Sequence, residues 1–343
     1  MMKSQRILLG LLLVLFLAAL FPSRTAAQGE VNIYTHRHYE ADEALFKTFT
    51  ASTGIEVNVV KANADELIER LKAEGEASPA DLLFTVDAGR LYKAKELGLL
   101  QAVESEVLAA AIPAQYRDPD SQWFGLTQRA RVMVSRKGEA PKGLTSFEDL
   151  AKPEYRGLVL ARSSSNIYNQ SLLASIIVAD GEEAAREWAT AVRKNMARAP
   201  QGSDRDQVRA MAAGLGDVAI ANTYYLGLLA TSAEAKDRKV AEQVEIIWAN
   251  QSGRGAHVNV SGAGVTKGSK NKDNAVKLLE FLASEESQKT YAETNFEYPV
   301  RAGTPWSDLL NSWGQFKADP LPLGKLGELN ATAVKIFGEA GWE

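Results

Sequence analysis

The sequence predicts an α/β fold arranged as two domains. Short β-rich runs alternate along the chain with amphipathic helical windows, which is typical of α/β units with largely parallel sheets. The 316 residues that would follow a leader at residues 1–27 are also too many for one ordinary core and about right for two domains. No internal repeat and no low-complexity linker longer than a few residues breaks the pattern. We therefore expect the chain to cross between the domains on strands rather than through a flexible tether.

Residues 1–27 have the layout of a cleaved secretory signal. Lys3 and Arg6 precede an apolar run from Ile7 to Phe21, and small residues follow up to Ala27. The apolar run is shorter than the ~20 residues that span a bilayer, which disfavours a membrane anchor. Cleavage after Ala27 would leave a mature chain of 316 residues.

The elements of the mature chain follow from hydrophobic periodicity. Residues 64–75 place three apolar side chains at the spacing of one buried helix face and end at a glycine, and residues 274–293 show the same helical periodicity over a longer span. The β-rich runs that we predict as strands are residues 31–36, 55–60, 81–86, 131–136, 157–162, 217–222, 244–250 and 257–265.

Composition excludes several classes of function. The chain has no cysteine, so a thiol-linked lipid anchor, a cysteine nucleophile, a thiolate zinc site and an iron–sulfur cluster are excluded. Without residues 1–27 it would carry 36 Lys and Arg against 43 Asp and Glu, which disfavours nucleic acid as a partner. Together with the signal, this composition predicts a soluble protein of the periplasm.

Familiar enzyme motifs are absent from the sequence. It contains no H-E-x-x-H helix, no G-x-S-x-G elbow and no phosphate-binding G-x-x-x-x-G-K-[ST] loop. Residues 261–269 are rich in glycine but lack the spacing of a phosphate or dinucleotide loop, and we interpret them as a turn around a strand.

Tyrosine and histidine side chains cluster after three predicted strands. Tyr224 and Tyr225 follow the run at 217–222, Tyr168 follows the run at 157–162, and His38 and Tyr39 follow the run at 31–36; these are positions that an open α/β sheet presents to its crevice. Taken singly, each tyrosine fits ordinary packing.

Binding of one kind of metal ion would explain why tyrosine and histidine follow all three strands. Phenolate is an anionic oxygen donor, and among biological metals it suits ferric iron best. A free tyrosine has a pKa of ~10 and stays protonated at neutral pH. A trivalent cation close by favours the charged form strongly enough to expel the proton.

The sequence resembles the periplasmic ferric-iron-binding proteins of iron ABC importers over most of the mature chain. The resemblance rests on RHYEAD, SSSNIYNQSLLAS and GDVAIANTYYLG, with VNVSGAGV and EYPVRAG further on. Their spacing matches the branch that binds iron through one histidine and four tyrosines. The resemblance implies that the metal ligands are His38, Tyr39, Tyr168, Tyr224 and Tyr225. It also implies that Arg37 and Arg129 supply positive charge behind them, with Arg131 as an alternative to Arg129 and a solvated surface charge as the alternative role for either.

The resemblance further implies a bilobed periplasmic-binding-protein fold with iron in the cleft between the lobes. One lobe would comprise residues 28–127 and 252–303, and the other residues 128–251 and 304–343. The expected function is capture of Fe(III), with Fe(II) also admissible, and delivery to an ABC permease of the inner membrane. A monomer without catalytic activity is expected.

Two other functions are compatible with the residues. A binding protein for an organic solute, such as a sugar, a polyamine or a thiamine-like cation, would use its cleft tyrosines for stacking. A secreted iron-dependent or hydrolytic enzyme is disfavoured because five protein ligands leave little room for an open coordination position. Whether iron arrives with a chelator or anion, and which permease receives it, stay open.

The remaining candidates have ordinary structural interpretations. Tyr34 and His36 share one face of the first strand, where we expect packing or surface positions, with a contribution of His36 to the site as the alternative. For His257 we expect a buried position in a strand or a hydrogen bond to backbone rather than a metal ligand.

Overall fold

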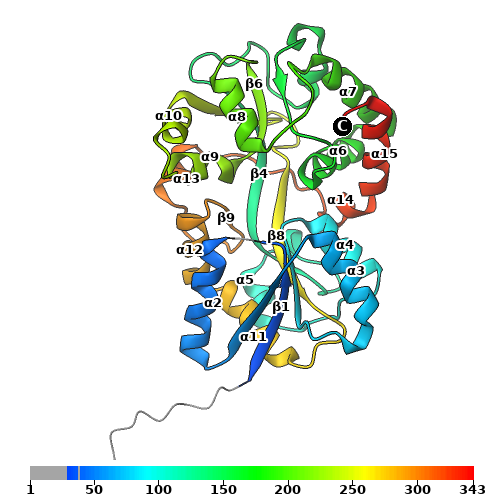
Figure 1. Cartoon of the computed structure of the whole chain (residues 1–343), viewed down its shortest axis with the longest axis vertical. Coiled ribbons are helices and arrows are strands. Elements are labelled where there is room, and N and C mark those ends of the chain that lie inside the picture. The colour runs from blue at the N-terminus through cyan, green and yellow to red at the C-terminus, as the bar shows by residue number, and fades with distance from the viewer. Residues whose placement is uncertain (1–28, 38) are drawn as a thin grey trace, which may run out of the picture.

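The structure, a computed structural model, describes residues 29–37 and 39–343 and consists of two α/β lobes joined by long strands (Figure 1). The strands are β1 (Glu30–Thr35), β2 (Glu56–Lys61), β3 (Leu82–Thr85), β4 (Phe124–Arg136), β5 (Val159–Leu160), β6 (Val218–Asn222), β7 (Val244–Ile247), β8 (Val258–Val265) and β9 (Tyr298–Pro299). They form one mixed sheet in the order β2-β1-β3-β8-β4-β6-β5, with β7 and β9 also paired to β4. The prediction of a bilobed α/β fold is confirmed.

Helices cover the sheet in both lobes. Around β1, β2 and β3, which we call the N-lobe, lie α2 (Glu40–Thr53), α3 (Ala64–Glu74), α4 (Ala88–Glu96), α5 (Glu106–Ala111), α11 (Lys272–Leu282) and α12 (Glu285–Thr294). Around β5, β6 and β7, the C-lobe, lie α6 (Ile167–Asp180), α7 (Glu182–Asn195), α8 (Asp204–Ala212), α9 (Thr223–Ala230), α10 (Ala235–Gln243), α13 (Asp308–Ser312) and α15 (Asn330–Ala340). The short helix α14 (Gly324–Glu328) packs against both α4 and α6.

Strand β4 carries the chain from one lobe to the other. Its first half, up to Ala130, pairs with β8, and its second half, from Arg131, pairs with β6 and β7. The expectation that the chain crosses between lobes on strands is confirmed. The predicted strand at 131–136 is only the second half of β4, because almost every residue of β4 is buried and no alternation marks its start.

The expectation of largely parallel sheets is wrong. Among the residues that the structure describes, five of the eight strand pairings are antiparallel, and β1–β2, β1–β3 and β5–β6 are parallel. The cause is the double crossing between lobes. Because β4 leaves the N-lobe and β8 returns to it alongside, the two central strands must run in opposite directions.

The helical periodicity at 274–293 belongs to two helices rather than one. Helix α11 ends at Leu282, and the hydroxyl of Ser284 accepts a hydrogen bond from the backbone N–H of Ser287 to begin α12. Helix α11 buries four apolar residues, whereas α12 buries Ser287 and Gln288 beside Tyr291 and Ala292. The capping serine is the local signal that separates them.

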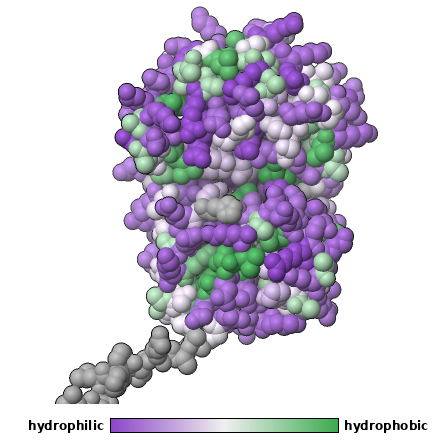
Figure 2. Space-filling model, in the orientation of Figure 1, coloured by the Kyte–Doolittle hydropathy of each residue, from purple (hydrophilic) through white to green (hydrophobic). Residues whose placement is uncertain are grey.

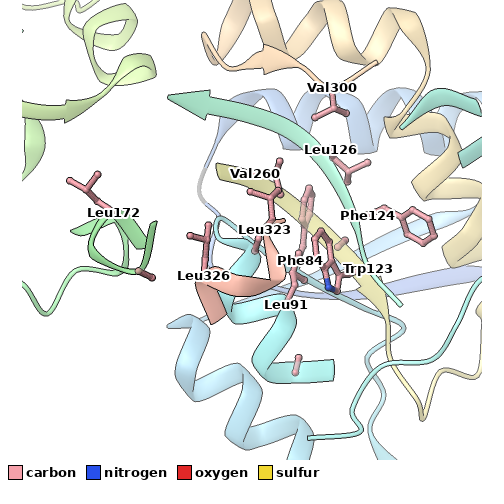
Figure 3. Close-up of a cluster of buried hydrophobic side chains, with 14 of the residues drawn as sticks. Phe84, Leu91, Trp123, Phe124, Leu126, Leu172, Val260, Val300, Leu323 and Leu326 are labelled. Carbon is pink, nitrogen blue, oxygen red and sulfur yellow. The ribbon is translucent and has the colours of Figure 1, made fainter. Parts of the chain in front are cut away.

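The C-terminal segment packs into the core between the lobes. In Figure 3, Leu323 and Leu326 lie beside Leu91 of α4, and Leu172 of α6 lies on their other side; all four belong to one cluster of buried side chains. Helix α14 approaches α4 so closely that a Cβ atom at Gly327 would lie 2.7 Å from the ring of Tyr92. The lobe boundaries drawn from the sequence stay a prediction.

Most of the surface in the view of Figure 2 is polar, with an apolar area on the N-lobe below the interlobe cleft. On the N-lobe, a groove of about 510 Å³ is lined by Phe46 of α2 and by Val57 and Val59 of β2, among others. Within residues 29–37 and 39–343, no helix is both long and apolar enough to cross a membrane.

Candidate metal-binding site

The four candidate tyrosines all lie at helix N-termini that follow strands. Tyr39 is the residue before α2, and its side chain makes no capping hydrogen bond. Tyr168 is the second residue of α6, whose cap Asn166 accepts a hydrogen bond from the Tyr168 backbone N–H at 3.0 Å. Tyr224 and Tyr225 open α9 directly after β6. The positive end of a helix dipole favours an anion at such positions, which suits a phenolate.

The fold brings these tyrosines together from both lobes. The Tyr224 hydroxyl donates to the Tyr168 hydroxyl at 3.1 Å. The Tyr224 ring centre lies 4.2 Å from that of Tyr225 and 6.2 Å from that of Tyr39. Tyr224 therefore contacts each of the other three, of which only Tyr39 belongs to the N-lobe.

The tyrosines border a cleft of about 650 Å³ that both lobes line. His36 and Arg37 face it from the N-lobe, and Arg205 of α8 and Leu228 of α9 face it from the C-lobe. Val86, at the end of β3, packs against the tyrosines as an apolar wall. The cleft is the kind of concave, mixed polar and apolar site in which proteins bind small ligands.

Burial favours the neutral form of three of the four phenols in the free protein. It raises the pKa of Tyr39, Tyr168 and Tyr224 above the ordinary tyrosine value, and Glu297 adds to the effect on Tyr39. Neighbouring phenols raise the pKa values further, because each would repel the charge of the next. A strongly charged cation in the cleft would oppose this effect and favour the ionised form.

Arg37 lies under Tyr39 and is fixed by acidic partners. Its guanidinium is buried 4.7 Å from the centre of the Tyr39 ring. Nε and Nη2 each donate to one carboxylate oxygen of Asp42 at 2.9 Å, and Glu297 lies 3.9 Å from Nη2. The expectation that Arg37 lies close behind a candidate ligand agrees with this geometry.

Arg129 and Arg131 both lie behind Tyr168. Their guanidinium carbons are 5.4 and 6.0 Å from the Tyr168 ring centre, and each residue is only 2% exposed. Neither arginine is therefore a solvated surface charge. Arg131 donates to Asp204 and Asn222, both at 2.9 Å, whereas Arg129 lies 3.4 Å from Asp87. Residues two apart on a strand share a face, so the two arginines act on the same tyrosine.

Sequence reasoning missed the carboxylates that hold these arginines. Asp42, Asp87 and Asp204 are each at most 5% exposed and each pairs with a buried arginine. Asp87 follows the β-rich run at 81–86, so the strand-end argument that selected the tyrosines also applies to it. Arg205 was missed as well, because a single arginine in a helical window carries no signal that it faces a cleft.

The histidines have different positions. His38 lies outside the described residues. His36 lines the cleft, so it lies nearer to the site than a surface position would. His257 is 5% exposed, and burial and nearby arginines, chiefly Arg254, hold its pKa well below the ordinary value; its buried position is confirmed. Tyr34 is buried and donates to Glu74 at 3.0 Å, which confirms its packing role.

The chemistry of the cleft depends on its tyrosines. In the part of the chain that the structure describes, no group of three or more histidine, cysteine, aspartate or glutamate side chains is arranged to hold a metal ion. Four phenol oxygens and the carboxylate of Glu40 are the oxygen donors of acidic groups that the described residues offer to a cation in the cleft, and three arginines lie behind the phenols.

Comparisons with known proteins agree with this geometry. The sequence profile of the bacterial extracellular solute-binding proteins matches residues 44–318. The chain is 50% identical over 317 residues to iron uptake protein A1 of Synechocystis sp., a match that covers 92% of this chain and 88% of that protein. Among solved structures it resembles Trichodesmium IdiA (FutA) in complex with iron and citrate, with 47% identity, a TM-score of 0.88 and coverage of 92% of this chain and 100% of the other. The ferric binding protein of Campylobacter jejuni matches at 44% identity, a TM-score of 0.88 and coverage of 91% and 100%. The chain therefore belongs to the bacterial extracellular solute-binding proteins, and its relatives include iron uptake and ferric-iron-binding proteins.

Proposed function

We propose that this protein is a periplasmic carrier that binds ferric iron in the interlobe cleft and delivers it to an ABC permease. Its ligands are Tyr39, Tyr168, Tyr224 and Tyr225, together with His38. The observation that carries the proposal is the convergence of four tyrosines from two lobes, with the Tyr168 and Tyr224 hydroxyls 3.1 Å apart. The relatives named for iron uptake or iron binding support iron as the bound ion.

The charges around the cleft fit this cargo. Four phenolates exceed the charge of one ferric ion, and the buried arginines behind them offset the excess. Within residues 29–37 and 39–343, Nη1 of Arg37 and Nη1 of Arg129 are buried without a hydrogen-bond partner. An unpaired buried donor is costly, so negative charge that develops on Tyr39 and Tyr168 would be stabilised there.

Transport rather than catalysis follows from the ligand count. Five protein ligands leave little room for substrate on the metal. Because the ligands come from both lobes, iron release requires the lobes to separate, which a permease can control. The signal-like residues 1–27 support export to the periplasm. Fe(III) is the preferred oxidation state, and an imidazole ligand would also tolerate Fe(II).

The alternative is a carrier for an organic solute. The cleft volume of about 650 Å³ and the close pair of Tyr224 and Tyr225 rings would suit stacking on such a molecule. In that case the phenols would stay neutral.

Visible absorption separates the two functions. The purified protein, stripped of metal and loaded with one equivalent of ferric iron, should acquire the colour of phenolate-to-iron charge transfer. A variant with Tyr168→Phe and Tyr225→Phe provides the control and should stay almost colourless. A colourless wild-type protein that retains no iron would favour the organic solute.

A further inference from the structure

Asp87 is a buried carboxylate at the end of β3 that collects donors from four elements. One oxygen, Oδ1, accepts from the backbone N–H of Gly89 at 2.8 Å. The other, Oδ2, accepts from Ser171 Oγ at 2.9 Å, from Asn259 Nδ2 at 2.8 Å and from Arg129 Nη2 at 3.4 Å. Asp87 itself is fully buried.

Three of these donors belong to the N-lobe side, and one does not. Gly89 lies on α4, and Asn259 and Arg129 are paired with each other on β8 and β4. Ser171 lies on α6 of the C-lobe, one turn after Tyr168. The hydrogen bond from Ser171 therefore joins the lobes, whereas the other three are compatible with separated lobes.

Asp87 is linked to Tyr168 through Arg129 as well as through Ser171. Arg129, held against Asp87, lies 5.4 Å from the Tyr168 ring centre. Burial raises the pKa of Asp87, and the nearby Arg129 opposes that effect. A buried carboxylate is costly unless hydrogen-bond donors surround it. In the closed form water cannot reach Asp87 to replace the Ser171 hydroxyl, so loss of this donor would destabilise the closed form.

We propose that Asp87 is a positioning residue for the iron site. Through Ser171 it draws the first turns of α6 to the N-lobe, and so it holds the Tyr168 hydroxyl close to Tyr39 when the lobes are closed. The inference rests on the proposed function, because it assigns to Asp87 the placement of an iron ligand.

Helix α6 offers a matched control for the test. Ser171 and Ser175 lie one turn apart and are each 1% exposed. The Ser175 hydroxyl donates at 2.7 Å to the carbonyl of Leu172 in its own helix. Ser171→Ala and Ser175→Ala thus make the same buried change on the same helix, but only the first removes a bond between lobes.

The measurement is the rate of iron release from loaded protein into excess chelator, followed by loss of the charge-transfer band. Ser171→Ala should release iron about tenfold faster than wild type or more, since a hydrogen bond to a charged group is lost only from the closed form. Ser175→Ala should stay within about twofold. Iron-free Ser171→Ala and Ser175→Ala should melt at similar temperatures, because the bond between lobes is broken when the lobes open.

A double-mutant cycle with Asp87→Asn assigns the effect to the pair. In the Asp87→Asn background, Ser171→Ala should accelerate release much less than it does in wild type. The role of Asp87 would be overturned if the two serine variants released iron at equal rates, or if the effects in the cycle were additive. Because the protein would still take up iron and its colour in that case, the proposed function would stand. A wild-type protein that takes up no ferric iron would overturn both.

Discussion

The N-lobe and the C-lobe contribute to the candidate iron site in different ways. The C-lobe places three tyrosines at the start of α6 and α9, close enough for a hydroxyl contact between two of them and a ring contact between two. The N-lobe offers Tyr39 alone among the described tyrosines, over an arginine locked by Asp42 and Glu297.

This difference suggests an order of events. In the proposed site the C-lobe would supply three of the four tyrosine ligands, so iron could bind there while the cleft is open. Tyr39 completes the site only when the lobes approach each other. The C-lobe should therefore determine most of the affinity and the N-lobe should determine closure and retention.

The largest effect should come from pH, which acts on all the phenols at once. Burial raises the pKa of Tyr39, Tyr168 and Tyr224, so the iron-free protein holds their protons throughout pH 5 to 8. Iron binding must expel about one proton per phenolate, and the bound state therefore holds fewer protons than the separate protein and ion. Acidification favours release. His38 would add a loss of affinity below its ordinary pKa of ~6.5.

A chelator competition at several pH values measures this linkage. Corrected for chelator protonation and ferric hydrolysis, the affinity should fall by several decades over two pH units. A neutral stacking site for an organic solute would bind almost equally at pH 5 and pH 8. A corrected slope near zero would rule out tyrosinate ligands.

Single tyrosine changes in the C-lobe should come next. Tyr225→Phe and Tyr168→Phe remove one hydroxyl with little change in volume, so both variants should fold. Each should weaken ferric binding by orders of magnitude, because a bond and a charge are lost together. His36→Ala is the control in the same cleft and should bind as wild type does. Retention of affinity within about tenfold, or ~1.4 kcal/mol, in both tyrosine variants would refute the site assignment.

On the N-lobe side, Arg37 should matter more for folding than any C-lobe phenol does. Arg37→Gln would leave the buried carboxylates of Asp42 and Glu297 without their cation. Removing one member of a buried ion pair costs about 3 to 5 kcal/mol of unfolding free energy. Urea unfolding of the iron-free protein should show this loss, whereas Tyr225→Phe should unfold near the wild-type midpoint. Equal urea midpoints for Arg37→Gln and Tyr225→Phe would mean that the ion pairs of Arg37 do not stabilise the N-lobe.

How far the sequence predicts these features depends on whether the signal is local. The alternation of strands and helices is local and predicted the α/β lobes, but strand direction is set by distant pairing, such as β4 with β8, and was predicted wrongly. Strand-end positions selected Tyr39, Tyr168 and Tyr224, because each lies near the start of the helix that follows a strand. The contact of Tyr168 with Tyr224 depends on how the C-lobe folds, and the contact of Tyr39 with Tyr224 depends on how the lobes meet. No local pattern encodes either contact.

The buried charges show the same limit. Arg129 and Arg131 could have been placed on one face by the period of two along a strand, once that strand was known to be long. Asp87 follows a strand and also caps α4, and an aspartate at such a position is most often only a helix cap. Its hydrogen bond to Ser171 depends on a helix 84 positions away in the chain.

The smallest effect should be the change of shape, and it separates the two lobes most directly. Iron should shift the population toward a closed form, because Tyr39 can join the C-lobe tyrosines only when the lobes approach. Small-angle scattering of the wild type should show a modest decrease in radius of gyration on iron loading. Tyr39→Phe should keep the charge-transfer colour from the C-lobe phenolates and yet lose most of that decrease. Tyr225→Phe, loaded at a concentration that overcomes its weaker binding, should still close. If the radius of gyration of Tyr39→Phe decreased as much as that of the wild type, closure would not depend on the N-lobe phenol. If the wild type had the same radius of gyration with and without iron, its cleft would already be closed before iron binds.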